Sequence, residues 1–434
     1  MSKFSLNPVV GIDVSADFSY VAILAPNGDT FKKPFKIIHD SNGFNYLVET
    51  IKKVEEEFSM KSAIFMESTG VYHLPLFHFL NERFDNTFTI NPLVTKYNNN
   101  SNIRKAKNDK LDSLKIANIA KFQNVKYSKA PDMSYFVLKK MLREYYKLTD
   151  RCSDTKKKLS TDLRIIFPGY CDIFSDLTSM TSLAILTNYS TPNALLSAPK
   201  DDILKILSKA RKGNNWSLKI YSDLIKKAQD ASVIAVKFNF LNTFIASSID
   251  LINTYDRQIS NLLSQIDSFI YSDLFPENIR TNISLVDSIH GIGHLTAATL
   301  IAEIGDINDF IKPKKLIAFL GIDSSVKDSG KFKSTNNKIS KRGTRYGRRA
   351  LYAVALASIR NSRNGSPINS VLQQYYNNNL NGKQSKVALI AITHKIVLYI
   401  YSVLKNQKPF NLRDPMIHKQ MYLENHNTDT NTVA

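Results

Sequence analysis

Four acidic residues of this 434-residue chain have types and spacings suited to metal-dependent chemistry. Asp13 and Glu67 each end an apolar run, and Asp109 and Asp112 are three residues apart on one face of an expected helix. Carboxylates that meet at one place repel each other unless cations bind, and Mg²⁺ prefers carboxylate oxygens. We predict that the four hold Mg²⁺, with two ions about 4 Å apart promoting phosphoryl transfer. Singly, each acid also fits a surface or capping role, and Asp109 suits a helix N-cap.

A second set of candidate residues surrounds Ser329. This serine precedes Gly330, and a serine beside glycine in a loop is exposed and conformationally free. Between Lys327 and Arg349 the only acid is Asp328, and the expected nucleic-acid-binding cations of this segment are Lys331, Lys333, Lys338, Lys341, Arg342, Arg345, Arg348 and Arg349. Ser329 could therefore attack a phosphodiester whose charge these cations stabilise. A phosphate-binding loop with incidental serines fits the same residues, because Ser324 and Ser325 lie just before this segment and Ser334 lies within it.

A glycine-containing turn offers a third candidate site. Gly291 and Gly293 precede an apolar segment, 297–304, with the composition of a helix. Backbone N–H groups of such a turn can hold a phosphate, as in a helix-hairpin-helix element that grips the DNA backbone. An ordinary tight turn between helices explains the pattern equally well. His290 and His294 have no third ligand nearby in the sequence, so we predict no metal site there.

Charge and cysteine usage restrict the class of protein. Lys and Arg number 58 against 38 Asp and Glu, a net charge of +20 that favours a polyanionic partner, most simply nucleic acid. An anionic membrane surface, or a merely lysine-rich protein, is the alternative. Cys152 and Cys171 form no CxxC pair, so we expect neither zinc nor a redox motif. The start of the chain shows no signal peptide, and the apolar stretch 387–404 has polar residues in its middle, so we expect an intracellular protein with no membrane partner.

The first third of the chain predicts an α/β domain. Strands are expected at 9–14, 20–24, 31–38, 63–66 and 87–90, and apolar residues at helical spacing predict helices over 44–58 and 109–122. Three antiparallel strands, a helix, and then alternating strands and helices are typical of a ribonuclease-H-like fold.

The rest of the chain predicts helices. Apolar residues at alternating three- and four-residue steps over 138–166 and 241–269 predict two long helices, either an intrachain hairpin or an oligomerisation device. Between them lies a smaller helical insert, about 170 to 235. We expect four parts: an α/β domain at 1–130, a coiled-coil region with its insert at 131–280, a mostly helical domain at 281–412, and a loose tail at 413–434.

These motifs, in this order, resemble the DEDD transposase family of bacterial insertion sequences (insertion-sequence family 110), whose relatives include Piv-type DNA invertases. The resemblance rests on an ordered set of short sequences: Gly-Ile-Asp-Val-Ser at 11–15, Met-Glu-Ser-Thr-Gly at 66–70, Lys-Asn-Asp-Lys-Leu-Asp at 107–112, Ile-His-Gly-Ile-Gly at 289–293, Phe-Leu-Gly at 319–321, Ser-Gly at 329–330, Ile-Ser-Lys-Arg-Gly at 339–343 and Arg-Arg-Ala-Leu-Tyr at 348–352. The chain departs from the family pattern at Asn108, Ser113 and Gly347, which leaves the acids and Ser329 in place.

The resemblance implies a RuvC-like first domain, a helical coiled-coil middle and a mostly α transposase domain. It implies that Ser329 is the nucleophile of a DNA recombinase and that Asp13, Glu67, Asp109 and Asp112 complete a composite site with Mg²⁺. It further implies guidance by a structured RNA encoded in the element, donor and target DNA as substrates, a dimer or tetramer, and a bacterial cytoplasmic, nucleoid-associated location.

Two other functions fit the residues. A metal-dependent nuclease or junction resolvase would use only the acidic tetrad, with Ser329 binding phosphate. A nucleic-acid-binding protein without catalysis would bind with strong salt dependence and be insensitive to loss of Asp13. The second of these is disfavoured, because acids facing DNA without a metal repel it.

Overall fold

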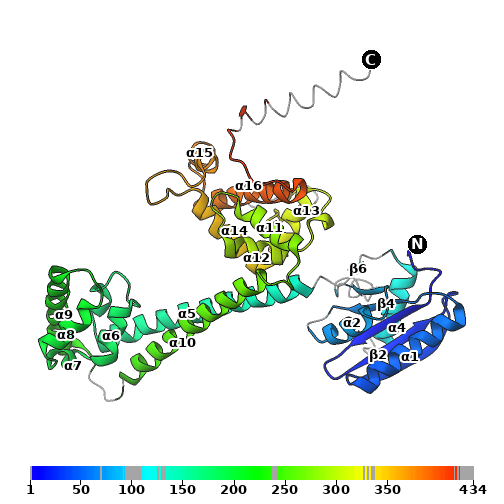
Figure 1. Ribbon diagram of the computed structural model, residues 1–434, viewed down its shortest axis with the longest axis horizontal. Coiled ribbons are helices and arrows are strands. Elements are labelled where there is room, and N and C mark those ends of the chain that lie inside the picture. Colours follow the sequence, from blue (N-terminus) through cyan, green and yellow to red (C-terminus); the bar gives the residue numbers. More distant parts are fainter. Residues whose placement is uncertain are drawn as a thin grey trace. The chain divides into compact units, whose positions relative to one another are not determined.

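The chain forms two compact units, Met1–Met133 and Ser134–Ala434, in a computed structural model (Figure 1). The structure describes residues 2–68, 71–90, 92, 109–124, 127–128, 133–236, 240, 242–325, 328–329, 332–333, 338–414, 416–417 and 420. Of residues 109, 128, 328–329 and 332–333 only the backbone is described. Each unit is treated by itself.

A mixed sheet forms the centre of the first unit. Its strands are β1 (Val9–Val14), β2 (Phe18–Leu24), β3 (Thr30–Ile38), β4 (Ala63–Glu67), β5 (Thr87–Ile90) and β6 (Tyr127–Ser128). The order is β3-β2-β1-β4-β5-β6, with β1, β4 and β5 parallel and the others antiparallel to their neighbours. The predicted ribonuclease-H-like arrangement is confirmed. The short edge strand β6 was not predicted from the sequence.

Helices cover both faces of this sheet. Alternate residues of β1 and β4, including Ile12 and Met66, pack with α1 (Ser41–Phe58) and α2 (His73–Asn81). The residues between them, including Val9 and Phe65, pack with α4 (Asp109–Phe122). Because side chains alternate along a strand, every second residue of β1 and β4 faces α4.

The backbone of α4 lies directly on β1. A Cβ atom at Gly11 would come within 2.4 Å of both the Ala117 nitrogen and the Ser113 carbonyl oxygen, so only glycine leaves room for the helix. Near the other end of α4, the buried Lys121 ammonium donates to the carbonyl oxygens of Ser5 (2.9 Å) and Asn7 (2.8 Å). Burial lowers the pKa of Lys121. The end of α4 thus lies by the start of β1, so the helix runs antiparallel to the strand.

Two long helices form an arm in the second unit. These are α5 (Met133–Ile166) and α10 (Asn242–Ile270), and Figure 1 shows them side by side. The Cys152 thiol lies 3.6 Å from the Asp256 carboxylate, and the Lys158 ammonium lies 3.3 Å from the Ser248 hydroxyl. From the first contact to the second, the residue number rises on α5 and falls on α10. The two helices therefore run antiparallel and form an intrachain hairpin, which is one of the two predicted arrangements. Leu241, the first residue of the predicted second seam, lies outside the described residues.

A helical insert joins the two helices of the arm. Its helices are α6 (Met180–Asn188), α7 (Pro192–Leu196), α8 (Lys200–Ser208) and α9 (Asn214–Ile234). They share a core with the neighbouring ends of α5 and α10, which includes Leu163, Tyr170, Leu224 and Ile249.

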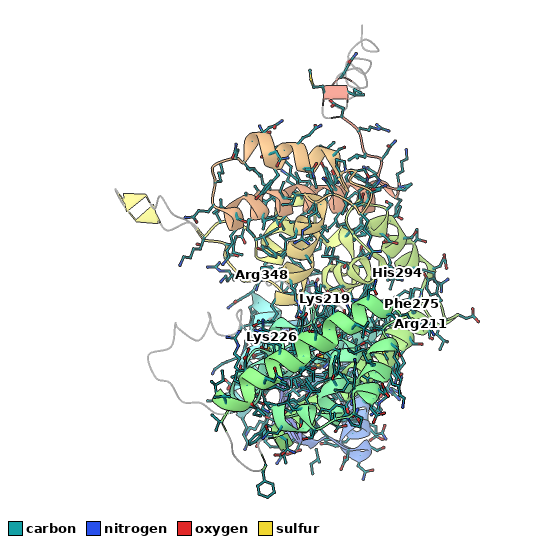
Figure 2. The ribbon with its side chains drawn as sticks, turned by 90° about the vertical axis from the view of Figure 1, so that its left-hand side faces the viewer. Arg211, Lys219, Lys226, Phe275, His294 and Arg348 are labelled. Atoms are coloured by element: carbon teal, nitrogen blue, oxygen red, sulfur yellow. The ribbon has the colours of Figure 1, made fainter. Side chains whose placement is uncertain are left out.

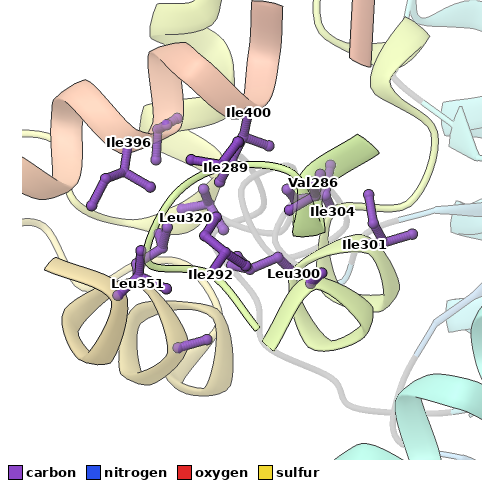
Figure 3. Close-up of a cluster of buried hydrophobic side chains, with 14 of the residues drawn as sticks. Val286, Ile289, Ile292, Leu300, Ile301, Ile304, Leu320, Leu351, Ile396 and Ile400 are labelled. Atoms are coloured by element: carbon purple, nitrogen blue, oxygen red, sulfur yellow. The ribbon is translucent and has the colours of Figure 1, made fainter. Parts of the chain in front are cut away.

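The helices after the arm surround a separate apolar core (Figure 3). They are α11 (Glu277–Asp287), α12 (His294–Ile304), α13 (Pro313–Leu320), α14 (Arg345–Ser358), α15 (Ser370–Asn379) and α16 (Ser385–Asn406), with the short pair β7 (Asp328–Ser329) and β8 (Phe332–Lys333) between α13 and α14. Among the described residues, α16 is the one helix long and apolar enough to cross a membrane. Half of its most apolar window is buried in the protein, as in a core helix, so the length and composition of α16 are weak evidence for a span.

A buried carboxylate attaches the arm to this core. Glu303 of α12 is 3% exposed, and Arg143 of α5 donates to its two oxygens at 2.7 and 2.9 Å. Lys139 approaches the same carboxylate at 3.7 Å, and burial lowers the pKa of this lysine. The hydrogen bonds to Glu303 raise the pKa of Arg143. A two-pronged charged bond of this kind fixes the orientation of α5 on α12.

We predict that Gly11→Ala loosens α4, because the added methyl group has no space between strand and helix. The expected loss of stability is about 1–3 kcal/mol, as for other overpacked sites. Hydrogen exchange followed by mass spectrometry should show faster exchange in α4. Gly293→Ala is the matched control, because a Cβ there meets nothing within 4 Å. Unchanged exchange in α4 would contradict the packing described.

We also predict that Arg143→Ala destabilises the second unit by about 3 kcal/mol, because it leaves the buried Glu303 carboxylate short of its main partner. Arg349→Ala is the control. It removes a more exposed ion pair of 2.6 Å with Asp150, which is worth under about 1 kcal/mol. Urea unfolding of the full chain measures both. Equal losses of unfolding free energy in the two variants would contradict a larger contribution from the buried Glu303 pair.

Candidate active site

The ends of two neighbouring strands bring Asp13 and Glu67 to the same level. In the parallel pairing of β1 with β4, Ile12 stands opposite Met66, and the two acids follow directly. Since Ile12 and Met66 face α1 and α2, alternation turns Asp13 and Glu67 to the face that α4 covers. Both acids are half-buried. Their place at the ends of neighbouring strands agrees with the apolar runs that precede them, whereas the sheet face they share was not predicted from the sequence.

The direction of α4 brings its first turn to the same end of the sheet. The helix passes Gly11 at Ser113 and Ala117, so the residues before Ser113 lie toward the end of β1 where Asp13 is. The Lys110 ammonium lies 6.0 Å from the centre of the Tyr20 ring, and Tyr20 stands opposite Asp13 in β2. Asp112 and the backbone of Asp109 therefore lie at the acidic end of the sheet.

The three carboxylates whose side chains are described, those of Asp13, Glu67 and Asp112, do not form a closed metal site. Asp112 is paired with Lys115 of its own helix at 2.7 Å. Within the described side chains, no group of three or more His, Cys, Asp or Glu residues is placed to hold a metal ion. The side chain of Asp109, the fourth predicted ligand, lies outside that set. The donor types still fit Mg²⁺, because a partly exposed ion pair is worth under about 1 kcal/mol and opposes a competing cation weakly.

Ser329 lies in a narrow ribbon between α13 and α14. Its backbone pairs with Phe332 in the two-residue strands β7 and β8. At the base of the ribbon, Ser324 forms a bridge with Ile339, and Ser325 donates from both its nitrogen and its hydroxyl to the Lys338 carbonyl oxygen at 2.8 Å. Gly330 and Lys331 lie outside the described residues, as do the side chains of Ser329 and Lys333.

Two of the short motifs support the base of this ribbon by packing together. The Lys341 nitrogen donates to the Gly321 carbonyl oxygen at 3.0 Å. A Cβ at Gly343 would lie 2.1 Å from the Phe319 carbonyl oxygen, so glycine is required for this approach. The segments 319–321 and 339–343 thus form one compact support.

The predicted nucleic-acid-binding cations near this support fall into two groups. Lys338, Lys341 and Arg342 are exposed. The others that are described are engaged within the protein. Arg348 donates to the Gly343 carbonyl oxygen at 2.7 Å. Arg349 is paired with Asp150. The hydrogen bond from Arg345 to the Tyr346 hydroxyl (2.9 Å) raises the pKa of the guanidinium. Arg348 therefore has a structural role that its position in a basic run did not reveal.

The two glycines of the third candidate site differ in their surroundings (Figure 2 labels the neighbouring His294). Gly291 has φ 101°, and a Cβ there would meet the Ser358 hydroxyl at 2.6 Å, so this glycine serves the turn and its packing. Gly293 precedes α12 with no side-chain cap, and nothing lies within 4 Å of its Cβ position. Of the two, Gly293 has open space around it.

Sequence reasoning missed the Arg143–Glu303 pair. A single acid inside the apolar segment 297–304 was the available signal, since a charge in a buried stretch requires a partner. Nothing in the sequence indicated which cation that partner would be.

Comparison with known proteins agrees with this arrangement of motifs. A family model described as "Transposase", of the DEDD type from IS110 elements, matches residues 10–168, and a model described as "Transposase IS116/IS110/IS902 family" matches residues 283–376. The first range contains all four acids, and the second contains Ser329 and its basic surroundings.

A curated relative extends the comparison. The transposase for insertion sequence element IS1111A of Coxiella burnetii (strain RSA 493 / Nine Mile phase I) is 30% identical over 125 residues. The match covers 29% of this chain and 33% of that relative, so it spans about a third of the relative's length. The two family models together cover more than half of the chain, and the first extends from the first unit into the second. The chain belongs to the IS110 family of transposases.

Proposed function

We propose that this chain moves its own insertion sequence by cutting and rejoining DNA, with Ser329 as the nucleophile and the acidic residues as metal ligands. One observation carries the proposal: α4 runs antiparallel to β1, so Asp112 lies at the strand ends that bear Asp13 and Glu67. That convergence suits a site for divalent cations, and family membership makes DNA the expected substrate.

In the proposed chemistry, each phosphoester bond that breaks is replaced by another phosphoester bond. The Ser329 hydroxyl oxygen attacks a DNA phosphorus, its proton leaves to a base, and the bond from phosphorus to one DNA oxygen breaks. This gives a phosphoserine link and a free DNA hydroxyl end. Attack by a hydroxyl end of another strand then restores the serine and joins the new strands. Asp13, Glu67, Asp109 and Asp112 would hold divalent cations, which would supply charge stabilisation for this transfer.

The positive charge of the chain supports contact with DNA near the serine ribbon. Lys338, Lys341 and Arg342 are exposed at its base, and no ion pair to them occurs among the described residues. Such cations position a phosphate backbone without reading bases. Open space around Gly293 suits a further backbone contact.

Three further parts of the proposal come from the family resemblance. An element-encoded structured RNA pairs with donor and target DNA and supplies the sequence specificity, in the way that guide pairing does elsewhere. The chain acts as a dimer or tetramer. It works in the bacterial cytoplasm at the nucleoid, and the net charge of +20 is compatible with binding both RNA and DNA.

We predict that both sets of residues are essential for transposition. The family resemblance implies that the element is excised as a circle. In cells carrying the native locus, amplification across the junction of that circle should give a product with wild type and none with Ser329→Ala or Asp13→Ala. Ser325→Ala and Glu57→Ala are matched controls that should keep the product. The Ser325 hydroxyl already donates to a backbone carbonyl, and Glu57 is an exposed residue of α1, on the sheet face opposite α4.

The same experiment separates the alternative functions. A product that persists with Ser329→Ala but is lost with Asp13→Ala would indicate metal-only chemistry, as in a nuclease or resolvase. A product that persists with both would contradict any catalytic role for these residues.

We further predict that purified protein needs a divalent cation for DNA cleavage. Chelation should abolish cleavage and Mg²⁺ should restore it. Asp112→Asn should raise the Mg²⁺ concentration for half-maximal cleavage at least about tenfold, because one anionic ligand is lost. The exposed Glu57→Gln should leave it unchanged. Cleavage that is insensitive to chelation would contradict the metal role.

A further inference from the structure

The end of the helical insert carries a basic surface with an aromatic side chain at its centre. The twenty residues 203–222 contain five cations and no Asp or Glu. We define the insert patch as Lys209, Arg211, Lys212, Trp216 and Lys219. It lies in the loop between α8 and α9 and on the first turns of α9, which belong to neither of the two candidate catalytic sets.

The cations of the insert patch have no acidic partners. Lys209, Arg211, Lys212 and Lys219 are exposed, and across the fully described insert no carboxylate pairs with any of them. The neighbouring Lys205, by contrast, is paired with Asp202 at 3.2 Å. Figure 2 looks onto this end of the molecule and shows Lys219 and Lys226 along α9, with Arg211 near the end where the helix begins. Four unpaired cations on one short stretch attract a polyanion.

Trp216 gives this surface a second property. It is the one tryptophan of the chain, and part of it packs against the insert core while the rest is exposed. The Lys212 ammonium lies 5.1 Å from the centre of its ring. A partly fixed aromatic ring keeps its position without a ligand, and the flexible lysine stem lets the ammonium move to a phosphate. A ring held this way can stack an unpaired base, which bases inside a duplex do not offer.

The backbone of the loop is shaped to present these side chains. Arg211 has φ 55° and Gly213 has φ 89°, both in the left-handed region, so the chain turns sharply between α8 and α9. Arg211 and Lys212 at this turn are exposed, and Asn214 and Asn215 are exposed beside them. Cations for phosphates, amides for base edges and one ring for stacking together suit the binding of single-stranded nucleic acid.

We propose that the insert patch binds an unpaired nucleic-acid strand, with a base on Trp216 and phosphates on Arg211, Lys212 and their neighbours. The ligand class is single-stranded RNA or DNA, which share this chemistry. The proposal assigns the insert a binding role that strand transfer at Ser329 and the acids does not require.

The single tryptophan makes a local test possible in the full-length chain. Short unlabelled strands of single-stranded RNA, single-stranded DNA and duplex DNA are titrated while Trp216 fluorescence is followed. Fluorescein-labelled versions of the same strands give total binding by anisotropy. We expect quenching by a single strand to follow its total binding, with weaker quenching by duplex. The RNA and DNA arms identify which single strand the patch prefers.

Charge variants test the phosphate contacts and leave the reporter in place. Arg211→Gln/Lys212→Gln should weaken single-strand binding about tenfold and lower the salt slope of log affinity by about 1.4, since two phosphate contacts are lost. Lys52→Gln/Lys53→Gln is the matched control. It removes the same charge from exposed positions of α1 and should change the affinity less than about twofold. Trp216→Phe, followed by anisotropy, should weaken binding less than Trp216→Ala, because phenylalanine keeps a stacking face.

Three results would overturn the proposal. They are unchanged Trp216 fluorescence when anisotropy shows saturation, equal quenching by duplex and single strand, or equal effects of the two double charge variants. Because the readout is binding at Trp216, each result is independent of whether Ser329 and the acids catalyse strand transfer.

Discussion

The contact between the backbone of α4 and strand β1 at Gly11 determines the rest of the candidate acidic site. Without a side chain at this position, the Ser113 and Ala117 backbone rests on the strand itself. The buried Lys121, bound to the carbonyl groups of Ser5 and Asn7, fixes the other end of the helix. The helix therefore runs antiparallel to β1, and its first turn lies at the strand ends that carry Asp13 and Glu67.

In the second unit, helices support the basic ribbon that contains Ser329. The Arg143–Glu303 bond fixes the arm on α12, and the apolar core behind it holds α13 and α14 in place. Arg348 and Gly343 then close the base of the ribbon. Charge is thus used in two ways in this unit. Buried or engaged cations maintain the structure, whereas others such as Lys341 and Arg342 are exposed.

The sequence predicted those features that depend on local patterns. The apolar runs 9–14 and 63–66 predicted strands that end near Asp13 and Glu67, and the seams of 138–166 and 241–269 correspond to the arm helices. The direction of α4, the partner of Glu303 and the structural use of Arg348 depend on contacts between distant segments, which periodicity does not encode. The pairing of Asp112 with Lys115 is local, but its competition with a metal ligand role is not apparent from spacing.

The most direct test of the account is to trap and locate the bond between protein and DNA. A nicked donor substrate whose released strand diffuses away should leave the protein covalently joined to DNA, and mass spectrometry of digested adduct locates the linkage. The account predicts a phosphoester on Ser329 that forms with Mg²⁺ and is absent in Asp13→Ala. DNA cleavage by the wild-type protein without an adduct, or with the linkage on another residue, would contradict it.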